Sequence, residues 1–476
     1  MRTIVVGGGI TGLTLGFRLR EGGPAGCEVT VLEAGERPGG HATTLREDGF
    51  LVEGGPNGFL SREPGTLELA RELGLGAKLI EARPEAKKRY IVRGGRLCAV
   101  PDSPPALLTS PALSPAGKLR LLLEPWAKRA PEGIEETVHQ FAVRRIGAEA
   151  AEMLVDAAVA GISAGDSRAL SAAAAFPLML EMERDHGSLI RAMIARARAG
   201  MVSRIMSLEG GLGELAGALR ERLGGALRTG ARVARVARAP GGAGPDAPWR
   251  VTLADGTTLE AERLVLATPA WAAAALVRDL DPELARALET IRFAGVSLVA
   301  LAYRAADVPR RLDGYGYLVS RGEKLSTLGV VWESSLFAGR APQGMVLLRA
   351  FVGGERDPQA VELQEAEVVA LARRELQRVL GVAAAPARVW TFRWPRAIAQ
   401  YTLGQLDRVR QARALASRHP GLELVGTSYD GVSFNQAIAA ARSLADRLNA
   451  ADAAALARDG VPAGAATLAH GAAGAK

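Results

Sequence analysis

The sequence predicts an α/β protein built around a parallel sheet, and three observations indicate this fold class. The apolar, β-branched segment Thr3–Val6 predicts a buried strand, and the segment Leu13–Arg20 predicts a helix directly after it. A second strand is expected at Glu28–Leu32, which completes a βαβ unit at the start of the chain. Short apolar segments that alternate with helices return much later, at Val265–Ala267 and after Gly421, as expected of a sheet built from distant parts of the chain.

The turn between the first strand and the first helix is rich in glycine. Gly7, Gly9 and Gly12 follow the spacing G-x-G-x-x-G. In such a turn the first glycine permits the tight bend, the second lets the backbone approach a pyrophosphate, and the third lets helix and strand pack closely. The N-terminus of the helix adds unpaired N–H groups and the positive end of a dipole. We therefore expect a dinucleotide to be held by Gly7, Gly8, Gly9, Ile10, Thr11 and Gly12.

An acidic residue ends the second strand. Glu33 lies about 20 residues beyond the turn, where a carboxylate accepts hydrogen bonds from a ribose 2′-hydroxyl. The same carboxylate disfavours a 2′-phosphate, so FAD or NAD is expected and not NADP. Gly39 and Gly40 then supply a second glycine pair, and with it this part of the chain resembles the FAD-binding start of the glutathione-reductase-type flavoproteins, which implies FAD as the dinucleotide.

Composition narrows the class of protein further. The 476 residues carry a net charge of +8, which fits either an arginine-rich composition or attraction to an anionic substrate or membrane. The basic residues are spread along the chain without a nucleic-acid motif, so no nucleic-acid partner is expected. Two cysteines cannot form a disulfide framework, and no histidine pair has metal-ligand spacing. The histidine spacing leads us to expect no metal. A first strand at the N-terminus and no long apolar run lead us to expect a cytoplasmic protein.

Several longer motifs resemble those of one enzyme family. The motifs are GPNGFL, KKRYIVRGGRLCAVP, GISAGDSRALSAAAAFPLMLEMERDHGSLI, QYTLGQLDRV and GTSYDGVSFNQAI. Together they make residues 2–449 similar to the oxygen-dependent, FAD-type protoporphyrinogen and coproporphyrinogen oxidases of the flavin-containing amine oxidase superfamily. The segment GDS-x-x-LS-x-x-x-x-FP is more selective for this family than the glycine turn, which many flavoenzymes share.

The resemblance implies a particular domain organisation. It implies a discontinuous, glutathione-reductase-type FAD-binding Rossmann domain from residues 1–81, 205–270 and 387–450. A mostly helical insertion would span residues 82–204, and an α+β substrate-binding domain residues 271–386. Residues 451–476, rich in Ala and Gly, are expected to form a flexible tail. The apolar and basic stretch 105–126 fits either an ordinary packed helix or a peripheral contact with the inner face of the cell membrane.

The resemblance also implies a reaction. Such enzymes remove six electrons from a porphyrinogen, with O2 as the final acceptor and H2O2 as by-product, in heme biosynthesis. The flavin N5 is the hydride acceptor, so no side chain is expected to act as a catalytic acid, base or nucleophile. We expect protoporphyrinogen IX as substrate, with coproporphyrinogen III as the alternative. The product would pass to a chelatase, and relatives of this kind occur as monomers and homodimers.

Site residues follow from the resemblance position by position. Arg89 would bind a substrate propionate, Tyr315, Leu318 and Phe351 would sandwich the macrocycle, and the backbone of Gly161 would lie at its edge. A solvated Arg89 and ordinary core packing of the three apolar residues are the alternatives. The remaining FAD contacts would come from Glu33, Ala34, Gly40, His41, Gly55, Pro56, Asn57, Gly58, Val233, Trp394, Thr427, Val432, Ser433 and Phe434.

Two positions depart from the family pattern, and two other functions remain open. Ala399 stands where relatives have proline, and Asn435-Gln436-Ala437 stands where they commonly have N-D-C. A flavin oxidase of amines or carotenoid precursors would share the two ends of the chain but not the GDS segment. A catalytically idle protein that binds porphyrin or flavin would keep a flavin that porphyrinogen fails to reduce.

Overall fold

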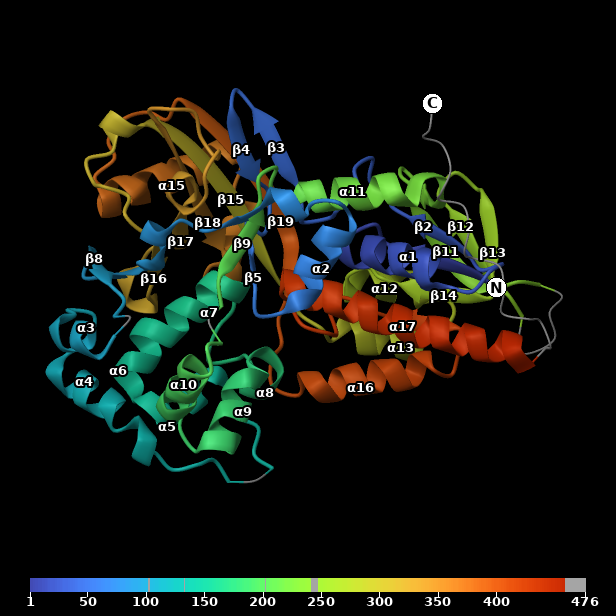
Figure 1. Cartoon of the computed structure of the whole chain (residues 1–476), viewed down its shortest axis with the longest axis horizontal. Coiled ribbons are helices and arrows are strands. Elements are labelled where there is room, and N and C mark those ends of the chain that lie inside the picture. The colour runs from blue at the N-terminus through green and yellow to red at the C-terminus, as the bar shows by residue number, and fades with distance from the viewer. Residues whose placement is uncertain (102, 132, 202, 241–246, 459–476) are drawn as a thin grey trace, which may run out of the picture.

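The computed structural model describes the whole chain except residues 102, 132, 202, 241–246 and 459–476. It contains two large sheets, one parallel and one mixed, with a group of helices below the second sheet (Figure 1). The predicted α/β fold is confirmed.

The parallel sheet gathers five strands from across the chain. Its order is β10 (Leu227–Arg228), β2 (Glu28–Leu32), β1 (Arg2–Val6), β14 (Arg263–Leu266) and β20 (Leu422–Leu424). All neighbouring strands pair in parallel. Successive side chains point to opposite faces, so Val5 packs with one core cluster and Ile4 and Val6 pack with another.

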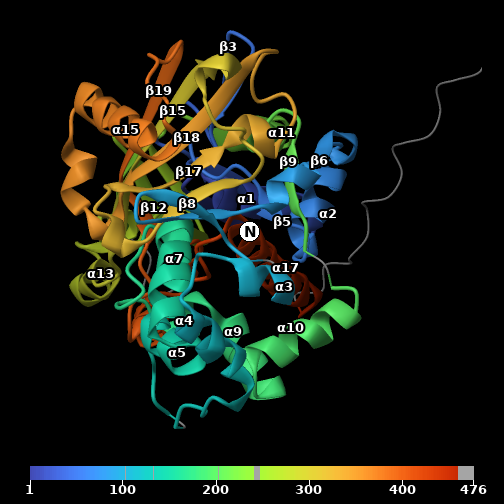
Figure 2. The ribbon, with the colours of Figure 1, turned by 90° about the vertical axis from the view of Figure 1, so that its left-hand side faces the viewer.

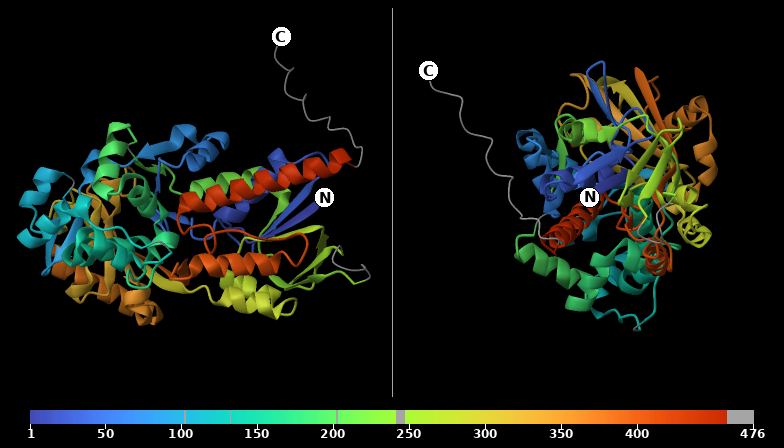
Figure 3. Two further views of the ribbon diagram at one scale, coloured as in Figure 1. Left: turned by 90° about the horizontal axis from the view of Figure 1, so that it is seen from below. Right: turned by 90° about the vertical axis from the view of Figure 1, so that its right-hand side faces the viewer.

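Helices cover both faces of this sheet. One face carries α1 (Ile10–Gly22), α11 (Gly213–Leu223) and α17 (Phe434–Arg458). The other carries α12 (Ala270–Val277), α13 (Pro282–Glu289) and α16 (Gln405–Ala416), together with the antiparallel strands β11 (Val233–Arg238), β12 (Trp249–Leu253) and β13 (Thr258–Ala261). Figure 3 shows the red helix α17 along the half of the molecule that holds the N-terminus, with the teal helices at the other end.

The second sheet is mixed and has seven strands. Its order is β19 (Arg388–Ala399), β15 (Phe293–Arg304), β18 (Met345–Gly353), β17 (Thr327–Trp332), β16 (Gly316–Val319), β7 (Tyr90–Arg93) and β8 (Arg96–Ala99). Helix α15 (Glu365–Leu380) packs on one face. The smaller sheets are β5 (Phe59–Leu60), β9 (Ile205–Leu208) and β6 (Leu79–Glu81), and the pair β3 (Thr44–Glu47) and β4 (Phe50–Glu53). They connect the two large sheets.

The helices of residues 104–198 form the third part of the molecule (Figures 1 and 2). They are α3 (Pro104–Thr109), α4 (Pro115–Leu122), α5 (Val138–Ile146), α6 (Ala148–Ala150), α7 (Asp156–Ser163), α8 (Ala172–Ala175), α9 (Pro177–His186) and α10 (Leu189–Arg198). A π-helical turn, η4 (Ala151–Val155), joins α6 to α7, so the helical path from α6 to α7 is not a regular α-helix throughout.

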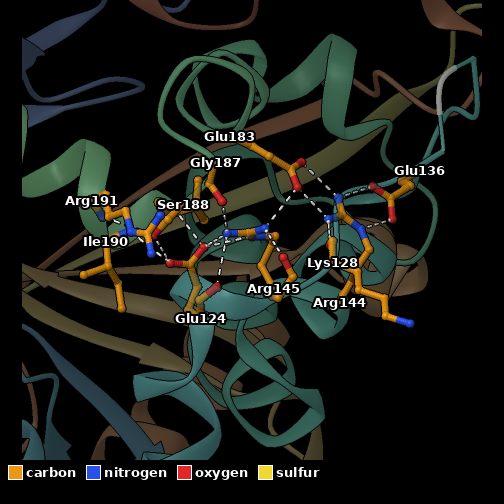
Figure 4. A network of polar contacts seen from close by, with 12 residues as sticks. Glu124, Lys128, Glu136, Arg144, Arg145, Glu183, Gly187, Ser188, Ile190 and Arg191 are labelled. Carbon is orange, nitrogen blue, oxygen red and sulfur yellow. Dashed lines mark hydrogen bonds and ion pairs between the residues drawn. The ribbon is translucent and has the colours of Figure 1, made fainter.

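A buried network of charges holds these helices together (Figure 4). Arg145 on α5 is fully buried and forms an ion pair with Glu124, which is also fully buried. The Glu124 carboxylate accepts further hydrogen bonds from the hydroxyl of Ser188 and from the N–H groups of Leu189 and Ile190 at the start of α10. Glu124 lies in the turn η3 (Glu124–Trp126), which ends residues 104–126, called the α3–α4 segment below. The network therefore fixes the end of this segment to the rest of the helices.

Three expected segments differ in the structure. Strands β7 and β8 fall within the predicted helical insertion but belong to the seven-stranded sheet, and β19 does so from within the predicted third FAD segment. Residues 451–458, expected in the flexible tail, instead continue helix α17 to Arg458. Asp452 on this last part of α17 is buried and pairs with Arg263 at 2.6 Å, which explains why the helix continues. Residues 459–476 lie outside the described part of the chain.

Candidate cofactor and substrate site

The glycine turn after β1 has the geometry that a pyrophosphate site needs. Gly7 has a φ of +107°, and a Cβ there would lie 2.9 Å from the carbonyl oxygen of Ala267. A Cβ on Gly12 would overlap the carbonyl oxygen of Gly7. A Cβ on Gly9, by contrast, would meet no atom within 4 Å. Because Gly9 is the N-cap of α1 and faces open space, the turn leaves room for a phosphate group at a helix N-terminus.

The carboxylate of Glu33 folds back onto this turn. It accepts hydrogen bonds of 2.7 Å from the N–H of Gly8 and from the N–H of Gly35. The N–H of Ala231 donates to the Glu33 carbonyl, which brings the start of β11 and Val233 to the same strand end. The acidic group therefore lies next to the turn, where the sequence predicts a ribose contact. The contacts proposed for Ala34, which is exposed, and for Val233 stay predictions.

The second glycine pair closes the other side of the turn. The N–H of Gly39 donates to the carbonyl of Gly8 at 2.7 Å, and a Cβ on Gly40 would lie 3.3 Å from Gly9 Cα. His41 comes next and meets Trp394 of β19 edge-on, with 4.6 Å between ring centroids. Desolvation by the surrounding protein lowers the pKa of His41, so its imidazole is neutral at neutral pH. Among the described residues, no three metal-ligating side chains come together around it or elsewhere.

The segment after β4 joins the glycine turn to the seven-stranded sheet. The indole N–H of Trp394 donates to the carbonyl of Gly54 at 2.7 Å. A Cβ on Gly55 would overlap the His41 carbonyl oxygen, and one on Gly58 would lie 2.7 Å from the Met206 carbonyl oxygen. The sequence predicts Gly55, Pro56, Asn57 and Gly58 at the cofactor, and the structure places this segment between the two large sheets.

A row of side chains crosses the sheet beside this segment. Strand pairing sets Leu318 opposite Gly329, Gly329 opposite Phe351, and Phe351 opposite Leu298. Gly329 has no side chain, and Leu318 leans over it: a Cβ on Gly329 would lie 3.0 Å from Leu318 Cδ2. Gly161 of α7 packs on the same leucine, since a Cβ on it would overlap Leu318. Leu318, Phe351 and Gly161, three of the predicted substrate contacts, therefore gather around Gly329 on one apolar face of the sheet.

A buried ion pair supports the cofactor segment from behind. Arg349 and Glu333 are each about 1% exposed and pair at 2.7 Å. Arg349 also donates to the carbonyls of Glu53 and Gly55, at 2.8 and 2.5 Å, and its guanidinium lies 4.9 Å from the Phe351 ring centroid. Glu333 accepts from the amide of Asn57 at 3.1 Å. The amide oxygen of Asn57 in turn faces the hydroxyl of Tyr315 at 3.5 Å. The pair thus connects the predicted contacts Asn57, Tyr315 and Phe351.

Arg89 differs from its neighbour Lys88. Lys88 pairs with Asp313 at 2.6 Å, whereas the exposed side chain of Arg89 has no hydrogen bond or ion pair with any residue that the structure describes. Burial raises the pKa of the Tyr315 phenol, and the positive charge of Arg89 opposes this rise. An unpaired guanidinium near Tyr315 is available for a carboxylate.

The chain end brings its predicted residues back to the glycine turn. Gly426 lies beside Thr11. In the turn that follows, the hydroxyl of Tyr401 accepts a hydrogen bond from the N–H of Gly431 and donates one to the carbonyl of Thr427. Ser433 and Gln436 cap the start of α17 reciprocally. Phe434 stacks on Phe59 with 6.3 Å between centroids, so the N-terminus of α17 is fixed next to the Gly54–Gly58 segment. Val432 packs against the core of the parallel sheet.

Both departures from the family pattern have structural partners. Asn435 is buried, accepts from the hydroxyl of Thr66 at 2.6 Å and donates to the Leu60 carbonyl. Gln436 serves in the cap just described. Ala399 is buried in the core that includes Tyr401. The GDS segment also has a structural role, since Ser171 N–H donates to the Tyr401 carbonyl and so fixes the helical part to the nucleotide-binding part.

The model of the family described as flavin containing amine oxidoreductase matches residues 10–449. The chain belongs to this family. Among curated relatives it is similar to the chloroplastic protoporphyrinogen oxidase of Nicotiana tabacum, with 31% identity over 94% of this chain and 85% of the relative. It is also 34% identical to the protoporphyrinogen oxidase of Bos taurus, over 94% and 98% of the two chains. The coproporphyrinogen III oxidase of Propionibacterium freudenreichii is 30% identical, over 94% and 90%. Within its family the chain therefore groups with the porphyrinogen oxidases, as the sequence motifs predict.

Solved structures agree on the fold of this flavoenzyme. A crystal structure from Exiguobacterium sp. 255-15, provisionally assigned as a protoporphyrinogen oxidase, has a TM-score of 0.83 and 25% identity over 94% of this chain and 99% of that one. Putrescine oxidase bound to putrescine has a TM-score of 0.69 at 19% identity, over 94% and 99% of the two chains. The protein is an oxidoreductase with FAD as its cofactor. The open space at Gly9, at the N-terminus of α1, fits that cofactor.

The sequence did not identify every residue of this flavoenzyme's site. It missed Glu333, Arg349, Gly329 and Gly54. Arg349 carries a usable signal, because an arginine inside the apolar run MVLLRAFVG must find a buried partner. Gly329 and Gly54 depend on strand register and on which chain passes beside them, and neither can be read from the local sequence.

Proposed function

We propose that this flavoprotein oxidises protoporphyrinogen IX to protoporphyrin IX, with O2 as final acceptor and H2O2 as by-product. The observation that carries the proposal is the apolar face formed by Leu318, Phe351 and Gly161 around Gly329. Arg349 connects this face to the Gly54–Gly58 segment, since it contacts both the Phe351 ring and the Gly55 carbonyl, and an apolar face beside the cofactor segment suits a tetrapyrrole. The relatives named protoporphyrinogen oxidase support the same reaction.

The roles of the chain's own residues follow from the site. Bound FAD supplies the electron acceptor. Leu318, Phe351 and Gly161 orient the macrocycle, while Arg89 binds a propionate. The Glu333–Arg349 pair holds the Gly54–Gly58 segment. This cofactor segment therefore keeps a fixed position relative to the apolar residues Leu318 and Phe351. No side chain of this site is required as an acid or base.

Coproporphyrinogen III is the second candidate substrate, and one observation favours it. It carries two more propionates than protoporphyrinogen IX. The cations Lys88, Arg310 and Arg311 gather near Arg89: Arg311 lies close enough to Lys88 to oppose the rise in its pKa, and Arg310 lies 5.1 Å from the Tyr90 ring centroid. Additional carboxylates would find additional cations there.

The experiment is aerobic formation of porphyrin fluorescence by the purified protein. Protoporphyrinogen IX and coproporphyrinogen III are supplied in parallel, with autoxidation blanks. We expect both to be oxidised, with the larger kcat/KM for protoporphyrinogen IX. A larger value for coproporphyrinogen III would assign the second candidate. If neither substrate is oxidised while FAD is bound, the proposal is contradicted. Another flavin oxidase or an idle binding protein would then be the remaining functions.

Replacing Arg89 by alanine is expected to raise KM about 10- to 100-fold and to change kcat much less. The lost charge-assisted hydrogen bond contributes about 1.5–3 kcal/mol to binding, in the ground state and the transition state alike. Steady-state kinetics on both porphyrinogens measure the effect. Lys87→Ala removes an exposed cation two residues away and serves as the matched control, with an unchanged KM. An unchanged KM for Arg89→Ala would discard the propionate anchor.

We further propose that the α3–α4 segment contacts an anionic membrane surface. Five large apolar side chains are exposed there: Leu108, Leu119, Leu122, Leu123 and Trp126, the last at 73%. The network around Glu124 fixes the turn that carries Trp126, so these side chains are held outward on ordered backbone. In the described part of the chain, no helix has both the length and the apolar character needed to cross a bilayer.

We expect the protein to sediment with vesicles that contain anionic phospholipid, and the double variant Leu119→Ser/Trp126→Ser to bind them at least tenfold more weakly. Each large apolar side chain taken out of water contributes about 1.5–3 kcal/mol, so two of them exceed a tenfold change. Trp271→Ser alters an exposed tryptophan on α12 and is the control. If the unaltered protein stays in the supernatant, the membrane contact is wrong.

A further inference from the structure

Helix α7 presents an apolar face to solvent where a soluble helix would carry polar residues. Ala158, Gly161 and Ile162 of α7 share one side at helical spacing, and Leu154 of the preceding turn η4 continues it. Gly161 and Ile162 are exposed, Ile162 by 61%. Leu154 packs in the same cluster as Leu318 of β16, and Gly161 faces Leu318 as well. The apolar side of α7 therefore packs against β16 at Leu318.

A buried carboxylate fixes the start of this helix to the sheet. Asp156 is 3% exposed and pairs with Arg356 at 2.6 Å. The same guanidinium donates to the carbonyl of Asp156 at 2.9 Å and to the carbonyl of Val319 in β16 at 2.6 Å. One arginine thus joins the first residue of α7 to the strand that carries Leu318.

Two further groups complete the environment of Asp156. The hydroxyl of Ser167 donates to its second oxygen at 2.7 Å. Arg321 lies 3.6 Å from Asp156 and pairs at 2.6 Å with Asp166. The selective GDS segment therefore supplies both a hydrogen bond and a counter-charge to this cluster.

The other end of α7 is held by neutral groups. The N–H of Glu355 donates to the carbonyl of Ala164 at 2.8 Å, and the amide of Gln400 donates to the carbonyl of Ser163 at 2.9 Å. Glu355 and Arg356 belong to the same turn after β18. This turn therefore contacts both ends of α7.

We propose that Asp156 and Arg356 are positioning residues that hold α7 against β16 and so fix the Gly161–Leu318 contact at the proposed macrocycle slot beside Leu318 and Phe351. The proposal rests on the proposed function. Neither side chain reaches the slot, because Asp156 is directed to Arg356 and Ser167. The pair acts through Gly161 and Leu318, which pack directly on each other.

The test compares Asp156→Asn with Asp452→Asn in the FAD-loaded, full-length protein. Asp452 forms a similarly buried ion pair with Arg263, far from the slot in the parallel-sheet half. Three quantities are measured: KM and kcat for both porphyrinogens, FAD content, and amide hydrogen exchange along α7. We expect Asp156→Asn to raise KM at least tenfold, to accelerate exchange in α7 and to keep FAD. Asp452→Asn should change neither KM nor α7 exchange.

Arg356→Lys is the milder variant if Asp156→Asn does not fold. It keeps the charge but cannot donate to Asp156 and Val319 together, so a KM increase of several-fold and faster α7 exchange are expected. A wild-type KM with unchanged α7 exchange would overturn the proposal, and so would an equal KM increase in Asp452→Asn. A wild-type protein that oxidises neither porphyrinogen would refute the proposed function instead, and α7 exchange would then decide on the positioning role by itself.

Discussion

Replacing Gly9 by valine is expected to give a folded protein that has lost its FAD. A Cβ at Gly9 would meet no protein atom within 4 Å, and the φ of −69° suits any residue, so the polypeptide should tolerate the change. The same side chain would occupy the space that the pyrophosphate needs at the N-terminus of α1. The expected result is a colourless protein with less than about a tenth of the wild-type FAD content after purification. Flavin absorbance and far-UV circular dichroism measure the two properties.

Two further glycine variants make this experiment specific. Gly217→Val alters an exposed glycine within α11 whose added Cβ would also meet no atom within 4 Å, and should keep its FAD. Gly12→Val should fail to fold, because its side chain would overlap the carbonyl of Gly7. A yellow, fully loaded Gly9→Val protein would show that the first turn does not hold the pyrophosphate.

Replacing Glu333 by alanine is expected to lower the free energy of unfolding by about 3–5 kcal/mol, because it leaves Arg349 buried without its carboxylate. Arg349 and Asn57 would also lose their common partner, so the Gly54–Gly58 segment beside the cofactor should loosen. Urea unfolding with FAD in excess measures the stability, and FAD titration measures the affinity. Both should fall together.

The control for Glu333 is an ion pair at the surface. Glu362→Ala removes the partner of Arg393 in a pair whose side chains are 72% and 43% exposed, and should cost less than about 1 kcal/mol. Equal losses in the two variants would mean that the Glu333–Arg349 pair is not a special support of the site. A stable Glu333→Ala protein with normal FAD affinity would contradict the role given to the pair.

The cofactor half of the site could be predicted from sequence because its signals are local. The turn Gly7–Gly12 and the acid at Glu33 belong to one βαβ unit, and their spacing alone carries the chemistry. Their neighbours in the structure, such as Gly39 beside Gly8, follow a few residues after Glu33.

The substrate half depends on pairings between distant residues. Arg349 donates to the carbonyl of Glu53, which lies 296 positions away in the sequence, and Arg356 donates to the carboxylate of Asp156, 200 positions away. Such partners are chosen by strand register and helix packing, which local patterns do not encode. For the same reason β7 and β8 could not be assigned to the second sheet from their own residues, since β7 pairs with the distant strand β16. Family motifs identified Leu318 and Phe351, but only the register placed Gly329 between them.

The order of strands in the parallel sheet has a consequence for biosynthesis. Strand β1 leaves the ribosome long before β20 and α17, which complete the sheet and cover α1. Until α17 follows, the part of α1 that packs on α17 stays uncovered, and transiently exposed apolar surface of this kind favours aggregation. A chain that ends before residue 422 would lack both β20 and α17, so we expect it to leave the β14 edge of the sheet and this part of α1 open.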